Sequence, residues 1–463
     1  MNCDILITSA ARLEIGPGKG LEDKSKGKWG YVSYVRYINV RKERFTMNNI
    51  FKSANIMLPK EAPMEKWAVI ACDQFTSDNE YWKRVRKNAE GSPSTINLVL
   101  PEALLGTPEE EAQTALINKT MADYMDKGVF TTYENSYIYV ERTMENGTIR
   151  KGLVGMVDLE AYDFNVGSTA DIRATEKTVL ERIPPRVKVR KDAPIELPHI
   201  IMLCDDHEKC LIEPITAKKN SLKKVYDCDL MEGGNHITGY LVEGKDVEEF
   251  DKVFEQYSAT VGKKYEGLKG TPMILATGDG NHSLATAKTC YEELKKANPG
   301  KDLSNHPARY ALVELENIHD EAQVFEPIHR VIFGVDGHKV LDDCKKAICV
   351  GNANDGFAVK AYVGNECTEI YLDKKKGELA VGVLQAWLDD YLKKNGGEID
   401  YIHDDDALIE LAAKPDSIGF LLPAMEKSQL FRGVIADGAL PRKTFSMGHS
   451  REKRYYVEAR KIR

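Results

Sequence analysis

The chain has 463 residues, of which 42% are hydrophobic and 29% charged, with a formal net charge of −8 and a pI near 5.8. This length suffices for two or three domains, and the composition is that of a globular protein with a substantial core. The acidic balance argues against general binding to nucleic acid or anionic membranes, although a local basic patch is compatible with it. No apolar run approaches the roughly 18–20 residues of a membrane span, and no secretory leader is recognisable.

The nine cysteines include no Cys-x-x-Cys pair, and several lie inside apolar runs. We interpret them as reduced, mostly buried thiols, which together with the missing leader predicts a cytoplasmic protein. Cys204, His207 and Cys210 are close in sequence. A zinc site is not the favoured interpretation, because no fourth ligand is evident.

Residues 1–46 differ in composition from the rest of the chain, being rich in glycine and lysine before an aromatic, β-branched stretch. Regular patterning begins at Met47, so we expect 1–46 to be a non-native or disordered extension upstream of a native start at Met47. Residues 47–335 are expected to form the main α+β domain. Residues 336–463 are expected to form a smaller α+β portion whose C-terminal segment returns to the main domain.

Apolar periodicity and turn residues predict the elements in chain order. Strands are predicted over 67–72, 137–144, 148–159, 199–204, 211–215, 237–242, 272–276, 310–315, 325–333, 357–363 and 368–372, with Asn146-Gly147 as a hairpin turn between the second and the third. Helices are predicted over 78–89, 108–127, 247–265, 284–294, 338–348 and 380–394, the first of them capped by Asp78 or Ser77. The segment Asp171–Pro198, with four prolines, is interpreted as a loop, and Ile418–Ile462 as strand-like with a basic tail. Hairpins and helices are interleaved, which predicts an α+β fold with mixed sheets.

The segment Thr277–Ser283 joins a predicted strand to a predicted helix through two glycines, Gly278 and Gly280, that flank Asp279. A glycine turn at a helix start points backbone N–H groups and the helix dipole at an anion. Asp279 would hold Mg²⁺ or orient a hydroxyl group, and His282 would contact phosphate. The alternative is a simple strand–turn–helix connection with an aspartate as turn former.

Glu176 lies between Arg173 and Lys177 and is a candidate general base. Alternating charge of this kind is also typical of a solvated helix face or loop, which the sequence favours here.

His329 and Arg330 end an apolar run, so a buried Arg330 needs a partner. Phosphate is one candidate, and a structural ion pair with Glu326 or another acid is the other. His236 follows two glycines and is either a ligand-facing turn residue or a polar loop residue. The basic Arg442-Lys443 and Arg451–Arg454 could meet phosphate, but solvated charge is the default interpretation.

Six short motifs in this order resemble the domain-of-unknown-function family 1015, of the ParB/sulfiredoxin-like superfamily, from Met47 to the C-terminus. They are Cys72-Asp73-Gln74-Phe75-Thr76-Ser77, Glu176-Lys177-Thr178, Gly234-Asn235-His236, Asp279-Gly280-Asn281-His282, Pro327-Ile328-His329-Arg330 and Leu440-Pro441-Arg442-Lys443. The resemblance implies a ParB/sulfiredoxin-like core. The relatives' turn is Asp-Gly-His-His-Arg, so Asn281 and Ser283 replace its first His and its Arg.

By this resemblance the chain is similar to free-serine kinases, which implies phosphoryl transfer from a nucleotide, ATP or ADP, with Mg²⁺ to a small serine-like hydroxyl compound. Asp279 (also as metal ligand), Glu176 as base and His282 are the implied catalytic residues. The candidate substrate- and phosphate-binding residues are Gly278, Gly280, Asn281, Ser283, His236, His329, Arg330 and Lys443. The alternatives are a nucleotide-binding regulator, a slow nucleotidase of ParB-like type, or a phosphatase-like hydrolase.

Overall fold

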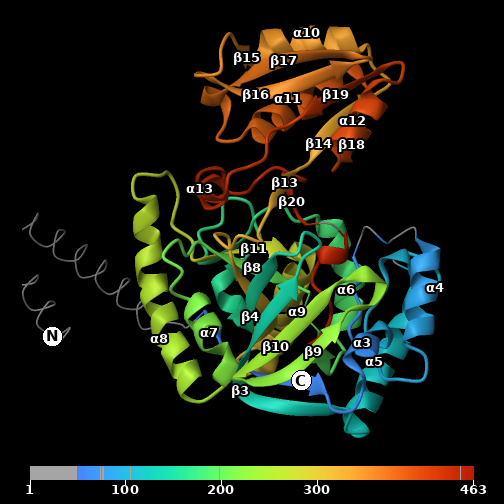
Figure 1. Cartoon of the computed structure of the whole chain (residues 1–463), viewed down its shortest axis with the longest axis vertical. Helices are drawn as coiled ribbons and strands as arrows, with labels where there is room; N and C mark the ends of the chain where they lie inside the picture. Colours follow the sequence, from blue (N-terminus) through green and yellow to red (C-terminus); the bar gives the residue numbers. More distant parts are fainter. Residues whose placement is uncertain (1–49, 73–74, 76–77, 105, 198, 449) are drawn as a thin grey trace, which may run out of the picture. The chain divides into compact units, whose positions relative to one another are not determined.

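The computed structural model of the chain describes residues 50–463 except 73–74, 76–77, 105, 198 and 449. The expected extension over 1–46 and its start at Met47 therefore lie outside the described residues. Within the described part, helices alternate with mixed sheets, which confirms the expected mixed α and β class (Figure 1).

Eleven strands of the described residues form the larger sheet, in which β5–β6, β6–β11 and β8–β12 are parallel and the other neighbours antiparallel. In pairing order they are β5 (Tyr162–Asp163), β6 (Ile172–Ala174), β11 (Leu275–Asp279), β8 (Ile201–Cys204), β12 (Tyr310–Asn317), β4 (Ile149–Asp158), β3 (Phe130–Thr143), β10 (His236–Val242) and β9 (Lys223–Asp229), with β1 (Phe51–Lys52) on β4 and β2 (Ala54–Pro59) on β3. All four residues of the central β8 are buried, as expected for a strand covered on both faces.

The expected hairpin is confirmed, since β3 and β4 pair antiparallel across the Asn146-Gly147 turn. Gly147 has φ +81°, a conformation that glycine adopts without steric cost. The backbone N–H of Met144 donates to the carbonyl of Thr148 at 2.8 Å, which closes the turn.

Seven helices of the described residues lie before the second sheet: α3 (Met64–Trp67), α4 (Asn79–Asn88), α5 (Glu110–Asp126), α6 (Ile183–Arg190), α7 (Glu213–Lys218), α8 (Lys245–Thr260) and α9 (Asn281–Ala297). The expected cap of α4 is confirmed, because the Asp78 carboxylate accepts the N–H of Tyr81 at 2.8 Å. No helix of the described part combines the length and the apolar character needed to cross a membrane.

Three expected elements are wrong. Trp67–Cys72 is not a strand: Trp67 ends α3, and only Val69 forms a bridge, to Tyr456. The predicted strand 211–215 enters α7, and the predicted loop before Pro198 contains α6. Both helices carry proline in the first turn, where no intrahelical N–H is required, so proline marks their start and not a loop.

Six strands of the described residues form a second sheet, which is contacted by α10 (Gly337–Ile348), α11 (Ala380–Asn395) and α12 (Asp405–Ala412) (Figure 1). In pairing order they are β15 (Cys349–Val350), β17 (Glu366–Asp373), β16 (Gly356–Val363), β19 (Ser417–Leu421), β14 (His329–Phe333) and β18 (Glu398–Ile402). The predicted strand 325–333 is divided, because β13 (Phe325–Pro327) pairs with the separate strand β20 (Phe445–Met447). The strand-like interpretation of the last segment missed α13 (Lys427–Asp437).

The segment after α13 contacts elements from the first half of the chain. Leu440 bridges Glu176, Tyr456 bridges Val69, and β21 (Arg460–Lys461) pairs with β7 (Ile195–Glu196). These contacts place the basic C-terminal residues beside elements about 200 to 400 positions earlier.

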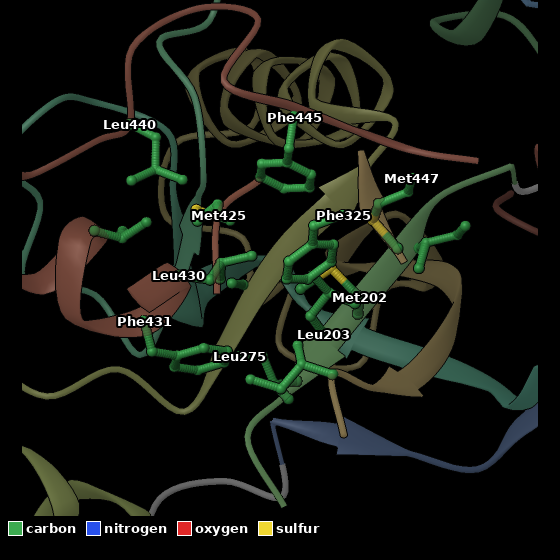
Figure 2. Packing of buried hydrophobic residues seen from close by; sticks show 14 of the residues in the cluster. Met202, Leu203, Leu275, Phe325, Met425, Leu430, Phe431, Leu440, Phe445 and Met447 are labelled. Carbon is green, nitrogen blue, oxygen red and sulfur yellow. The ribbon is translucent and has the colours of Figure 1, made fainter. Parts of the chain in front are cut away.

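Buried apolar side chains of β8, β13 and β20 belong to one cluster. Figure 2 shows Met202 and Leu203 of β8 with Phe325 of β13, Phe445 and Met447 of β20. The ring centroids of Phe325 and Phe445 lie 4.7 Å apart, within the range of interacting aromatic pairs. Burial of these side chains fixes β11, β8 and β20 relative to one another, and thereby the residues at their ends.

Candidate functional site

A cavity of about 540 Å³ lies among the residues that follow β6, the end of β11, helices α6 and α9, and the C-terminal segment. Eight lysine or arginine residues and three acids line it, in a protein with a net charge of −8. The cations are Lys177, Arg182, Arg186, Arg190, Arg442, Lys443, Lys453 and Arg454, and the acids are Glu176, Glu196 and Asp279. The cavity thus concentrates positive charge, which attracts anionic ligands.

The lining also includes apolar residues, among them Leu98, Val99, Leu100, Met121 and Val189. The cavity therefore offers both cationic and apolar groups to a ligand. A ligand that carries a charged group and a flat or apolar group matches such a lining.

The predicted turn lies at the cavity wall, where β11 ends and α9 begins. Gly280 has φ +77°, and a Cβ there would lie 3.0 Å from the Ile200 Cα. At Gly278 a Cβ would lie 2.8 Å from the Leu203 Cγ and 2.9 Å from the Met447 Sδ. The Gly280 side of the helix has no side-chain cap, so the first turn of α9 presents the positive end of its dipole beside the Asp279 carboxylate.

Asp279 is held in its ionised form. Its Oδ1 accepts the Gly280 N–H at 2.8 Å, and its Oδ2 lies 3.1 Å from the Lys453 Nζ. Burial works to raise the pKa of Asp279, but Lys453 and His199 outweigh it and hold this pKa below its ordinary value.

Two histidines line the cavity near this turn. The Ser283 Oγ and the His199 Nε2 are 3.1 Å apart, and burial lowers the pKa of His199 to about 4 despite the opposing charge of Asp279. His199 is therefore neutral at neutral pH. The His282 Nε2 accepts the Val179 N–H at 3.3 Å, which in a neutral imidazole assigns the proton to Nδ1.

The side-chain oxygen of Asn281 is a candidate ligand for a metal ion beside Asp279. Its Oδ1 is buried and has no hydrogen-bond partner among the described residues, although the residue lines the cavity two positions after Asp279. Mg²⁺ takes oxygen ligands and is commonly held by one or two side chains together with substrate phosphates. Asp279 and Asn281 fit this requirement, whereas the described residues contain no cluster of three or more His, Cys, Asp or Glu suited to a metal.

Glu176 lines the same cavity as Asp279 in a different electrostatic setting. Its Oε1 accepts the Thr444 N–H at 3.3 Å. Burial raises the pKa of Glu176, opposed by the N–H groups of Thr444 and Lys443 and by the charges of Lys443 and Arg330. Lys443 adopts φ +56°, an uncommon conformation for a residue with a side chain, and strain of this kind gathers at functional sites.

The cavity lining brings together most of the predicted site residues: Glu176, Gly278, Asp279, Gly280, Asn281, His282, Ser283 and Lys443. The remaining three, His236, His329 and Arg330, do not belong to the lining.

Arg330 is fully buried. Its guanidinium donates to the Gln385 Oε1 at 3.0 Å and to the Arg442 carbonyl at 3.1 Å. The positive charge of Arg330 also works to lower the pKa of Glu176. His329 is also fully buried: its Nδ1 accepts the Leu422 N–H at 3.1 Å.

The other ring nitrogen of His329, Nε2, lies 2.7 Å from Asp405, which ties β14 to the first turn of α12. His236 contacts Asp227 and Asp229 at 2.7 and 2.8 Å within the β9–β10 pair. Both histidines thus have structural partners.

Lys453 and His199 contact the predicted turn and had not been predicted as site residues. Lys453 belongs to the basic segment 451–454, whose charges the sequence predicted to be exposed to solvent. Arg182, Arg186 and Arg190 recur every four residues, a helical spacing that could have revealed the cationic face of α6.

The family described as "Protein of unknown function (DUF1015)" matches residues 54–433, and the chain belongs to this family. No curated relative matches the chain. Solved structures that it resembles include "Free serine kinase in complex with AMP", at 12% identity and a TM-score of 0.34, over 66% of this chain and 91% of that one.

Two further structures are similar at comparable distance. SbnI with C-terminal truncation, from Staphylococcus aureus, has 13% identity and a TM-score of 0.32 over 64% of this chain and 83% of its own. A conserved hypothetical protein from Pyrococcus furiosus has 12% identity and a TM-score of 0.30 over 63% and 88%.

Proposed function

We propose that this DUF1015 protein binds a nucleotide at the start of α9 and transfers a phosphoryl group to a small hydroxylated metabolite. The supporting observation is that one cationic cavity contains two carboxylates whose pKa values are moved in opposite directions. Divergent carboxylate environments within one site are typical of paired acid–base and charge-stabilising roles.

The phosphates of ATP would lie at the start of α9, where the helix dipole, Lys453 and His282 favour negative charge. The apolar lining residues, such as Leu98 and Met121, would receive the nucleobase.

Glu176 is the proposed general base. Its raised pKa, caused by burial, makes the carboxylate a better proton acceptor than an exposed glutamate. The acceptor hydroxyl oxygen would bond to the γ-phosphorus as the bond from that phosphorus to the ADP oxygen breaks. The hydroxyl proton would pass to Glu176, and ADP would leave.

Asp279 and Asn281 would hold Mg²⁺, whose role when bound is to neutralise charge on the transferred phosphoryl group. The Lys453 ammonium, now 3.1 Å from Asp279, would then face the phosphate oxygens. A serine-like acceptor is the proposed substrate class.

The test is phosphoryl transfer by the purified full chain with ATP, Mg²⁺ and L-serine, followed by phosphorus NMR. We expect ADP and a phosphorylated acceptor to form together, and Glu176→Gln to abolish both. ADP formation that is independent of any acceptor would support the nucleotidase alternative. Nucleotide binding without turnover would support the regulator, and release of inorganic phosphate from a phosphoester in the absence of nucleotide would support the hydrolase.

A further inference from the structure

We propose that Tyr401 and Arg442 form a subsite for a carboxylate, so that the phosphoryl acceptor is a small hydroxy acid. This assignment rests on the proposed function, since it names the second substrate of the same cavity. Both residues line the cavity, and neither belongs to the turn at α9.

Tyr401 presents a polar group that the protein does not satisfy. It belongs to β18, opposite Arg330 of β14, and its hydroxyl oxygen is buried without a hydrogen-bond partner among the described residues. A buried hydroxyl without a partner is costly, about 1–3 kcal/mol, so native structures seldom leave one unsatisfied. A ligand oxygen in the cavity would provide the partner.

Two guanidinium groups lie close to the Tyr401 ring. Arg330 lies 5.1 Å and Arg442 5.6 Å from the ring centroid, distances at which cations are attracted to an aromatic face. The buried Arg330 also donates to the Arg442 carbonyl at 3.1 Å. These contacts fix the orientation of the ring and the backbone of Arg442 before any ligand binds.

Arg442 supplies the charge that a carboxylate requires. Its side chain is 58% exposed, and its ion pair with Asp389 is 3.5 Å long. Such an exposed pair contributes little stability and is readily exchanged for a ligand. A guanidinium matches a carboxylate with two parallel hydrogen bonds, which a hydroxyl group or an amide cannot reproduce.

The proposed base and the proposed carboxylate ligand come from neighbouring parts of the chain. The Thr444 N–H contacts Glu176, so the segment 442–444 carries the carboxylate-binding arginine and a backbone donor to the base. Because Arg442 and Glu176 line the same cavity, one small molecule could place a carboxylate at Arg442 and a hydroxyl group at Glu176. The subsite therefore selects for a short hydroxy acid over a neutral alcohol.

Calorimetric titration of the full chain tests this directly, with L-serine and glycerate as acids, and with serinamide and glycerol as counterparts that carry a neutral group in place of the carboxylate. Each titration is run with and without a non-hydrolysable ATP analogue. We expect the acids to bind at least about tenfold more tightly than the neutral compounds, because a charge-assisted pair contributes about twice a neutral hydrogen bond.

Arg442→Gln should remove the preference for the acids, and Tyr401→Phe should weaken acid binding less. Both variants should keep the wild-type affinity for the ATP analogue. Arg432→Gln, at an exposed arginine of α13 outside the cavity lining, is the matched control and should resemble the wild type.

Equal binding of acids and neutral compounds, or no binding of either acid, would overturn the assignment. So would a loss of nucleotide affinity in Arg442→Gln with acid binding intact, since it would make Arg442 a phosphate ligand. Acid binding that requires Arg442 in a protein that binds no nucleotide would instead retain the subsite and reject the proposed kinase.

Discussion

Asp279 and Glu176 line one cavity, but different parts of the fold set their charge. Asp279 ends a strand at a helix N-terminus and faces Lys453, which helps to lower its pKa. Glu176 lies where residues 440–444 cross the chain that follows β6, and burial raises its pKa. The difference indicates separate tasks: a permanently charged group that organises phosphate, and a group that can take up a proton.

The electrostatic environments of Asp279 and Glu176 are also built from different parts of the chain. The Asp279 turn is built locally from a strand, two glycines and a helix, and only its counter-ion is distant. The Glu176 environment depends almost wholly on distant residues, since Thr444, Lys443 and Arg330 come from other parts of the chain. Substitutions at the two carboxylates should therefore affect different steps.

The largest expected effect is on turnover. Glu176→Gln should lower kcat by roughly 10²–10⁴-fold, the usual contribution of a general base, while nucleotide affinity stays near that of the wild type. Glu213→Gln is a matched control, because burial also raises the pKa of Glu213, which does not line the cavity. Loss of nucleotide affinity in Glu176→Gln would assign this carboxylate to phosphate binding and end the proposed division of roles.

A smaller effect is expected at the cation beside Asp279. Lys453→Met should weaken nucleotide binding by about 1.5–3 kcal/mol, the contribution of a hydrogen bond to a charged group, as measured by calorimetry. The exposed Lys461, outside the cavity lining, gives the control Lys461→Met. Unchanged affinity in Lys453→Met would show that Lys453 serves only as a partner of Asp279.

The two carboxylates should also affect stability with opposite dependence on pH. The lowered pKa of Asp279 stabilises the fold above the ordinary carboxyl pKa, and this contribution is lost as the pH falls through the lowered value. The raised pKa of Glu176 stabilises the fold below the ordinary pKa, and this contribution is lost as the pH rises through the raised value. Asp279→Asn should therefore be destabilised most at neutral pH, whereas Glu176→Gln should gain stability relative to the wild type as the pH rises.

Urea unfolding at about pH 3 and pH 5 tests Asp279→Asn, and unfolding at about pH 5 and pH 8 tests Glu176→Gln, because Asp279 titrates below the ordinary carboxyl pKa and Glu176 above it. The same trend in the two variants would contradict the opposite pKa shifts.

The smallest effect is expected at His236, which was predicted to bind ligand and lies outside the cavity lining. Asp229 and Asp227 raise the pKa of His236, but the ring is 43% exposed, so His236→Ala should cost about 1 kcal/mol or less. This contribution is present below the ordinary histidine pKa and disappears as the pH rises through the raised value. A loss of nucleotide binding in this variant would extend the site beyond the cavity described above.

Local patterns in the sequence were sufficient where the structure is local. The glycines of the α9 turn, the Asp78 cap and the Asn146-Gly147 hairpin each depend on neighbours within a few residues. The same reasoning identified Asp279 and His282 as neighbours of one turn. It failed for α6, because the two prolines were interpreted as loop residues and not as a helix start.

Long-range pairing could not be derived from the sequence alone. Lys453 meets Asp279 across 174 positions, and Thr444 meets Glu176 across 268. A basic tail has the same composition whether it is solvated or packed beside a carboxylate. Arg330 shows the converse: the sequence indicated that this residue needs a partner if it is buried, and the partners found are a glutamine side chain and main-chain carbonyls.

The central claim, that the start of α9 binds nucleotide phosphates, is tested most directly by thermal unfolding with millimolar ATP and Mg²⁺. A ligand that binds only the folded protein raises the Tm, and at 100 times its Kd contributes about 2.7 kcal/mol. We predict a clear increase in Tm for the wild type and for Glu176→Gln, and none for Asp279→Asn. No increase in the wild type, or an undiminished increase in Asp279→Asn, would contradict the account.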